Sequence, residues 1–211
     1  MTAHRVLTVL LCLGLLGCTG RQPGGPRTTI VPSATSTTRL DSDVGPTATQ
    51  RTTEAVAAAV RFVCSGQRLL DSPPTQLADV IRSMWSTSAA DGAVTATVDQ
   101  LAALRDRLDT GDGPTRYRQS VLATRVEEPS SAKVRVAVWW VGVLTRHGAV
   151  LPQAEWTTSL ITLVAEDGEW RVQAQSSEPG PTPEMGGDSE PTTHDEFERR
   201  LAGFVDWEAN R

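Results

Sequence analysis

Residues 134–143 read VRVAVWWVGV, and this stretch decides the fold. Valines and then Trp140 occupy every second position and alternate with Arg135, so one face of an extended strand is apolar while the other begins polar. From Trp139 onward both faces are apolar, which predicts that this half of the strand is covered on both sides. We therefore predict a strand over about Ala132 to Leu144.

The segments on either side of this strand carry their own periodic patterns. Further strands are expected at about 116–127, 154–165 and 170–175, with Asp167-Gly168 closing a tight hairpin. Apolar residues at helical spacing predict three earlier helices, over about 54–70, 75–85 and 98–108, the last after a loop at 90–92. The predicted fold class is α+β: N-terminal helices packed on a curved four-stranded antiparallel meander, with a separate C-terminal amphipathic helix.

Changes of composition divide the chain into five parts. Stretches rich in Thr, Pro and Gly have no sustained apolar periodicity and cannot bury enough surface to offset chain entropy. The predicted parts are a signal peptide (1–17), a lipidated cysteine with a disordered tether (18–53), an α+β domain (54–178), a linker (179–192) and the amphipathic helix (193–210).

The N-terminus resembles a bacterial lipoprotein signal. His4 and Arg5 precede an apolar stretch that is shorter than the roughly 20 residues of a spanning helix. At its end, Leu15-Leu16-Gly17-Cys18 resembles the lipobox, in which the cysteine is acylated before cleavage. Two acyl chains, such as palmitate, give stable anchoring, so we expect the chain at the extracytoplasmic face of the cell membrane. An ordinary signal peptide or an uncleaved anchor are the alternatives.

The overall charge excludes one class of partner. The net charge of −5 and the single lysine, Lys133, offer no cationic surface that could displace counterions from nucleic acid. Abundant Arg, Ala, Val, Gly and Thr indicate a GC-rich genome, for which an actinobacterial source would fit.

No pattern in the sequence indicates a catalytic centre. After the signal, histidine occurs only at His147 and His194, which are too far apart to predict a zinc site or a base. Serine-hydrolase, phosphate-loop and zinc-protease motifs are missing from the sequence. Acidic residues, Glu155 among them, mostly fall where strand ends or turns are expected, and Cys64 is expected to be buried. We predict no catalytic residue, cofactor or metal site, and chiefly apolar inward-facing positions.

The order of helices and then a curved meander, together with residues 134–143, resembles the cone-shaped fold of the nuclear-transport-factor-2-like and SnoaL-like superfamily over about 54–179. Among exported members it looks most like the periplasmic scaffold domain of type IV secretion and conjugation systems, and like lipoproteins of actinobacterial mobile elements. Those scaffold proteins usually carry a transmembrane helix, where this chain has a lipobox. The resemblance implies an interaction role, while enzymes of the fold place Asp, His or Tyr inside the cone.

We therefore expect a membrane-anchored interaction or scaffold lipoprotein, as an accessory of a conjugation or secretion assembly. Adjacent Trp139 and Trp140 must point to opposite faces of their strand, so both are core or one is an aromatic anchor at an interface. The C-terminal helix packs on its own domain, on another protein or on lipid. The candidate partner-binding residues are Trp139, Trp140, Phe197, Leu201, Phe204 and Trp207.

Two alternatives stay open beside the scaffold role. One is a module that binds a small apolar ligand inside the cone, lined by Trp139 or Trp140. The other is a SnoaL-like hydrolase or isomerase, which would need an acid or a histidine facing an open cavity. No oligomeric state follows from the sequence.

Overall fold

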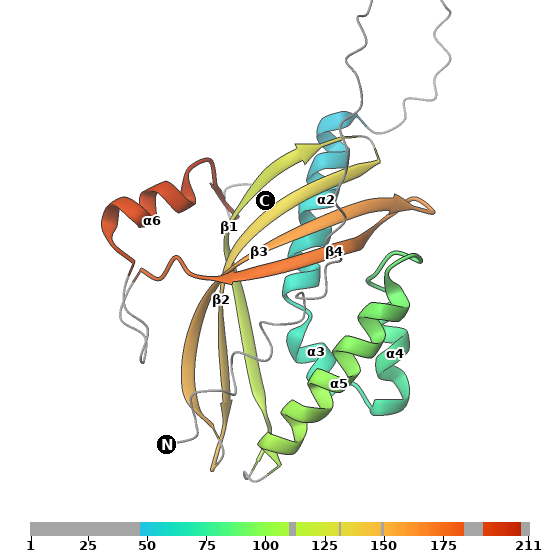
Figure 1. Ribbon diagram of the computed structural model, residues 1–211, viewed down its shortest axis with the longest axis vertical. Coiled ribbons are helices and arrows are strands. Elements are labelled where there is room, and N and C mark those ends of the chain that lie inside the picture. Colours follow the sequence, from blue (N-terminus) through green and yellow to red (C-terminus); the bar gives the residue numbers. More distant parts are fainter. Residues whose placement is uncertain (1–46, 110–112, 131, 149, 184–191, 208–211) are drawn as a thin grey trace, which may run out of the picture.

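The computed structural model describes residues 47–109, 113–130, 132–148, 150–183 and 192–207 (Figure 1). Four helices come first: α2 (Ala48–Val63), α3 (Gly66–Asp71), α4 (Pro74–Arg82) and α5 (Ala90–Leu108). Four long strands follow: β1 (Arg116–Pro129), β2 (Lys133–Arg146), β3 (Val150–Glu166) and β4 (Glu169–Pro179). The chain then forms α6 (His194–Leu201) and β5 (Val205–Asp206). The predicted signal peptide, Cys18 and most of the tether lie outside the described residues, as does most of the linker.

The strands form one antiparallel sheet in the order β4-β3-β2-β1-β5. The predicted α+β class and its four-stranded meander are confirmed, and β5 is an addition at the β1 edge. Asp167 and Gly168 both have positive φ, 51° and 81°, so the predicted hairpin between β3 and β4 closes as the residue pair requires.

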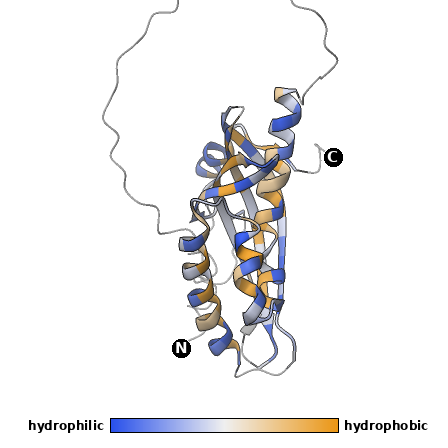
Figure 2. Ribbon diagram, turned by 90° about the vertical axis from the view of Figure 1, so that its right-hand side faces the viewer, coloured by the Kyte–Doolittle hydropathy of each residue, from blue (hydrophilic) through white to orange (hydrophobic). Residues whose placement is uncertain are grey.

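The hydrophobic core fills the space between α2–α5 and one face of the sheet, here called the inner face. Val134, Val136 and Val138 lie on this face with no exposed surface, opposite Ile161 and Leu163 of β3. Helix α2 crosses the sheet in Figure 1, and apolar residues, orange in Figure 2, occur on both the helices and the strands. The period-2 pattern of the sequence thus places its apolar side against the helices.

The first helix differs from its prediction at both ends. It begins at Ala48, before the expected start at 54, because the Thr47 hydroxyl caps it by accepting from the Gln50 amide at 3.2 Å. It also stops at Val63, where a single helix to residue 70 was expected. The Ser65 hydroxyl donates to the Phe62 carbonyl and the chain restarts as α3. Cys64 is exposed at this break, so its predicted burial is wrong.

The expected loop at 90–92 is also wrong, because these residues form the first turn of α5. The segment that joins α4 to α5 is bound to β4: the Ser86 amide donates to the Val172 carbonyl at 2.8 Å, and the Val172 amide donates to the Met84 carbonyl at 2.9 Å. The chain therefore turns immediately and enters α5 with Ala90 buried.

The C-terminal helix is shorter than predicted. It ends at Leu201, because Gly203 adopts φ +76° and breaks the helical path. Val205 and Asp206 then pair with Thr124 and Ala123 of β1. We call residues 192–207 the C-terminal strap. Among the described residues, no helix combines the length and the apolar character needed to cross a membrane.

Candidate functional site

A small cavity of about 50 Å³ lies between the helices and the inner face of the sheet. Its helix side is apolar and its sheet side is largely polar. The helix side is formed by Phe62, Val63, Leu69, Ile81, Met84 and Trp85, and the sheet side by Tyr117, Gln119, Trp140, Ser159 and Gln175. Ser65, Gly66 and Thr97 complete the lining, which contains no charged side chain. A buried water needs about 10–15 Å³ on such a measure, so the cavity has room for a few waters or a small chemical group.

A larger groove of about 730 Å³ adjoins this cavity. The two share Phe62, Ser65 and Met84 in their walls. The groove runs between α2 and the β3–β4 hairpin, and exposed Arg61 and Arg68 lie along it. A molecule with one end in the cavity would therefore pass Phe62 and Met84 and continue into a wider, more polar space.

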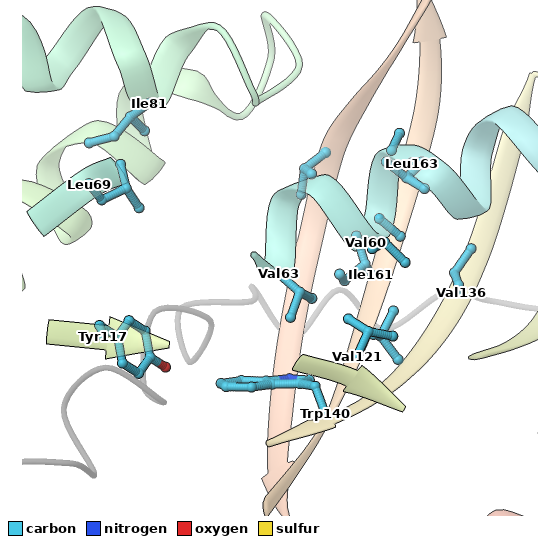
Figure 3. Close-up of a cluster of buried hydrophobic side chains, with 14 of the residues drawn as sticks. Val60, Val63, Leu69, Ile81, Tyr117, Val121, Val136, Trp140, Ile161 and Leu163 are labelled. Atoms are coloured by element: carbon cyan, nitrogen blue, oxygen red, sulfur yellow. The ribbon is translucent and has the colours of Figure 1, made fainter. Parts of the chain in front are cut away.

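The ring of Tyr117 is held between two glycines. A Cβ added at Gly66 would lie 2.4 Å from the ring, and one added at Gly142 would lie 2.9 Å from the Tyr117 hydroxyl and 2.8 Å from the Trp140 ring. Figure 3 shows the Tyr117 hydroxyl directed toward Trp140, on the strand side of Val63 and Leu69. The two glycines thus leave the space that the Tyr117 and Trp140 rings need. We call these two rings the aromatic floor of the cavity.

Four polar side chains form a hydrogen-bonded row at the sheet side of the cavity. The Trp140 indole donates from Nε1 to the Ser159 hydroxyl at 2.9 Å, and the Ser159 and Ser177 hydroxyls lie 2.8 Å apart. The Gln175 amide donates from Nε2 to the Ser177 hydroxyl at 3.3 Å. Its Oε1 is buried with no hydrogen-bond partner in the described part of the chain. The prediction of chiefly apolar inward positions is therefore wrong for this end of the sheet.

Glu155 is a partly buried acidic residue on the inner face of the sheet. It lies in the first half of β3, paired with Gly142, and its side chain is on the same inner face as Ser159. Desolvation by burial raises the pKa of its carboxyl to about 7. Burial, with the charge of Glu155 as a smaller contribution, also raises the pKa of Tyr117. Glu155 Oε2 is buried and has no hydrogen-bond partner among the described residues. Glu155 therefore differs from the solvated acids expected at strand ends and turns.

The predicted partner-binding residues are divided between the two faces. Trp140 is buried on the inner face, whereas Trp139 lies on the outer face beneath the strap. Trp139 stacks on Trp156 with ring centroids 5.6 Å apart, and Phe197 of α6 meets Trp139 edge-on at 5.6 Å. The Trp139 indole also donates to the Pro181 carbonyl at 3.1 Å. The C-terminal helix thus packs on its own domain.

The remaining residues of that set lie along the strap. Leu201 ends α6 and is half-buried. The Phe204 ring lies 4.6 Å from the Arg125 guanidinium, and Trp207 packs against the core while its amide donates to the Leu122 carbonyl at 3.0 Å. Phe204 and Trp207 therefore have contacts within the chain, and Leu201 is partly covered.

Neither of the two histidines that follow the predicted signal lines the cavity. His147 and His194 are both exposed. Within the described ranges, no three His, Cys, Asp or Glu side chains are grouped so that they could hold a metal ion. The chemistry that the site can offer is therefore neutral hydrogen bonding from the row and proton exchange at Glu155.

Sequence reasoning missed Glu155, Tyr117 and Gln175. The alternation of β3 contained a signal, because residues 155, 157 and 159 share the parity of the buried Ile161 and Leu163. The inward orientation of Gln175 can be predicted from the alternation of β4 only if the register shift opposite residues 162–163 is known.

Comparisons with known proteins bear on the fold. No protein-family model and no curated protein sequence matches this chain. Solved structures with a similar chain path include a scytalone dehydratase-like protein of Novosphingobium aromaticivorans, with 12% identity, 68% of this chain and 90% of that chain covered, and a TM-score of 0.42. ActVI-ORFA of Streptomyces coelicolor has 14% identity, covers 61% and 96%, and has a TM-score of 0.39. A hexachlorocyclohexane dehydrochlorinase, LinA type 2, has 13% identity, covers 68% and 87%, and has a TM-score of 0.37. At these identities the likeness concerns the arrangement of helices and strands alone.

Proposed function

We propose that this chain is an exported lipoprotein, anchored to the cell membrane through Cys18, whose folded domain binds a small uncharged ligand in the cavity between α2–α5 and the sheet. The observation that carries the proposal is the composition of the cavity wall. Aromatic and aliphatic side chains cover one side and hydrogen-bonding groups the other, which is the usual make-up of a small-molecule site.

The unsatisfied polar atoms support the same proposal. Buried polar groups in folded proteins nearly always have a partner, and leaving one without a partner costs about 1–3 kcal/mol. Gln175 lines the cavity, and its Oε1 is buried and lacks a partner within the described residues. A ligand that hydrogen-bonds there would recover this cost on binding.

The scaffold role in a conjugation or secretion assembly stays a prediction. Trp139 and Phe197 contact each other, so a partner protein would have to displace α6 before it reached Trp139. The described surface therefore favours ligand binding over this role.

Acid–base chemistry is a second candidate because of Glu155. A carboxyl whose pKa is raised to about 7 can both release and accept a proton near neutral pH. Glu155 does not itself line the cavity, but its charge influences Tyr117, which does. A hydrolase or isomerase would use this pair.

Native mass spectrometry of the full-length protein, extracted gently from its own membrane, tests the binding proposal. We expect an added small-molecule mass that is absent from Ile81→Phe, which fills the cavity from α4. Leu201→Phe makes a similar change on the outer face and should keep the ligand. A bare protein mass for the wild type would contradict ligand binding.

The anchor is tested separately. Wild-type protein should partition with membranes and carry the mass of a diacylglycerol on its first residue, whereas Cys18→Ala should be neither acylated nor cleaved at this position. An unmodified N-terminus in the wild type would contradict lipidation.

A further inference from the structure

The hydrogen-bonded row beside the cavity has an imbalance of donors and acceptors. The Trp140 indole can only donate, and it donates to Ser159. At the other end the Gln175 amide donates to Ser177. The two hydroxyls between them have two protons but share one hydrogen bond, so one O–H is left without an acceptor in the row.

The Gln175 side chain has the complementary deficiency. Its Oε1 is buried and has no partner in the described part of the chain. If the amide turns over, Oε1 accepts from Ser177, a continuous chain of donors runs from Trp140 to Gln175, and the amide N–H₂ is left unpaired instead. With the amide as first described, both Oε1 and one serine O–H are unpaired; with the amide turned over, the N–H₂ group is unpaired, so neither orientation completes the row.

Trp140, Ser159 and Gln175 of the row reach the cavity, whereas Ser177 does not line it. Ser159 has no exposed surface. The opposite wall is formed by Phe62, Met84 and Trp85, with Phe62 and Trp85 in edge-to-face contact at 5.6 Å. The missing partner must therefore carry a polar end and an apolar body.

We propose that the ligand carries a neutral hydroxyl group that is held between the Gln175 amide and the Ser159 hydroxyl, with its hydrocarbon body against Phe62 and Met84. A hydroxyl both donates and accepts, so it completes the row in either orientation of the amide. This inference rests on the proposed function, because it specifies the chemical class of the ligand in that cavity.

The lining argues against the other head groups. A charged group would be desolvated in a cavity that has no charged side chain to pair with it. A pure hydrocarbon would leave Gln175 Oε1 without a donor, as it is without a ligand. The body of an alcohol can extend past Phe62 and Met84, where the cavity meets the larger groove.

Three fluorinated probes of matched size test the head group: 4-fluorobenzyl alcohol, 4-fluorotoluene and 4-fluorobenzylamine. Binding to the full-length protein in lipid nanodiscs is measured by ¹⁹F NMR relaxation, with empty nanodiscs as the blank. We expect the alcohol to bind about five- to tenfold more tightly than either of the other probes, the effect of one well-made hydrogen bond.

Variants of the row sharpen the result. Gln175→Leu and Ser159→Ala should reduce the preference for the alcohol to near unity while 4-fluorotoluene still binds. Ser176→Ala, on the neighbouring exposed position of β4, should leave the preference unchanged. Circular dichroism melting of each variant checks that it is folded.

The possible outcomes separate the two proposals. If alcohol and toluene bind equally, or if the amine binds most tightly, the hydroxyl inference is wrong and ligand binding in the cavity stands. If none of the probes binds, and the extracted protein has a bare mass, the proposed function is wrong as well.

Discussion

The two faces of the sheet are built from adjacent residues of β2 but are covered in different ways. Trp140 points to the inner face, which the helices cover, and its exposure there is 6%. Trp139 points to the outer face, where its cover is α6, a helix of eight residues with no buried side chain. Two tryptophans thus differ in role: Trp140 is part of the hydrophobic core, and Trp139 makes a peripheral contact. The difference comes from the elements that cover each face and not from the residue type.

The largest expected difference between the faces is in the free energy of unfolding. Trp140→Ala should lower it by about 3–5 kcal/mol, because it removes a buried ring and leaves Ser159 without its donor. Trp139→Ala should lower it by about 1–2 kcal/mol, the range for partial burial and an aromatic pair. Urea unfolding followed by circular dichroism measures both, and equal losses would contradict the comparison.

A smaller effect is expected from filling the space around Tyr117. Gly142→Ala places a Cβ 2.8 Å from the Trp140 ring, so overpacking should cost about 1–3 kcal/mol. Gly92→Ala is the matched control, since no atom lies within 4 Å of its added Cβ. In α5 this control should be neutral or slightly stabilising. A stable Gly142→Ala protein with an unchanged melting curve would show that the aromatic floor is loosely packed.

Glu155, on the inner face, should also make the free energy of unfolding depend on pH. The pKa of Glu155 is raised to about 7, so the folded state holds its proton where the unfolded state, with an ordinary carboxyl near 4.3, has lost it. The contribution of Glu155 to the free energy of unfolding is complete when the pH is below the pKa of the unfolded state. It is lost as the pH rises to about 7, the pKa of the folded state. The loss is on the order of 1–2 kcal/mol after allowance for solvent screening.

Chemical denaturation at pH 4.5, 6 and 8 measures this dependence. Glu155→Gln should remove it, while Glu198→Gln, exposed on α6, should keep it. A slope of the opposite sign in the wild type would mean that a donor from the protein stabilises the charged carboxylate.

The smallest effect is expected on the outer face. Phe197→Ala removes the edge contact with Trp139 and should cost about 1 kcal/mol or less. Amide hydrogen exchange should become faster in α6 and stay unchanged in α2 and α5. Glu198→Ala, the exposed neighbour, serves as the control. Faster exchange in the inner helices would show that the strap supports the whole domain.

The strands and most of the helices could be predicted from the sequence, because alternation and helical spacing report burial directly. The hairpin at Asp167-Gly168 was also predictable, since few residue pairs accept positive φ at both positions. The start of α2 was missed because its first turn is exposed and depends on a single hydroxyl cap at Thr47. Local polar chemistry of this kind leaves no apolar period.

The candidate site was harder to predict, for a different reason. Its polar atoms come from all four long strands, β1 to β4, and their meeting depends on strand register and on bulges. Trp140 was identified as a single residue, whereas its partners Ser159 and Ser177 are common residue types without any distinguishing motif. The role of the strap depends on Gly203, whose positive φ sends the chain back to β1.

The short strand β5 has a consequence for the association of the protein with other copies of itself. β1 is a long edge of the sheet, and such edges invite pairing with a strand of another molecule. Val205 and Asp206 occupy this edge at Thr124 and Ala123, next to the irregular register between Val121 and Ala123. The strap thus blocks the middle of the edge, and near the start of β1 the Tyr117 amide donates to the Gln67 side chain of α3 at 2.6 Å. The attachment of the strap to β1 would protect crowded copies of the chain from edge-to-edge aggregation.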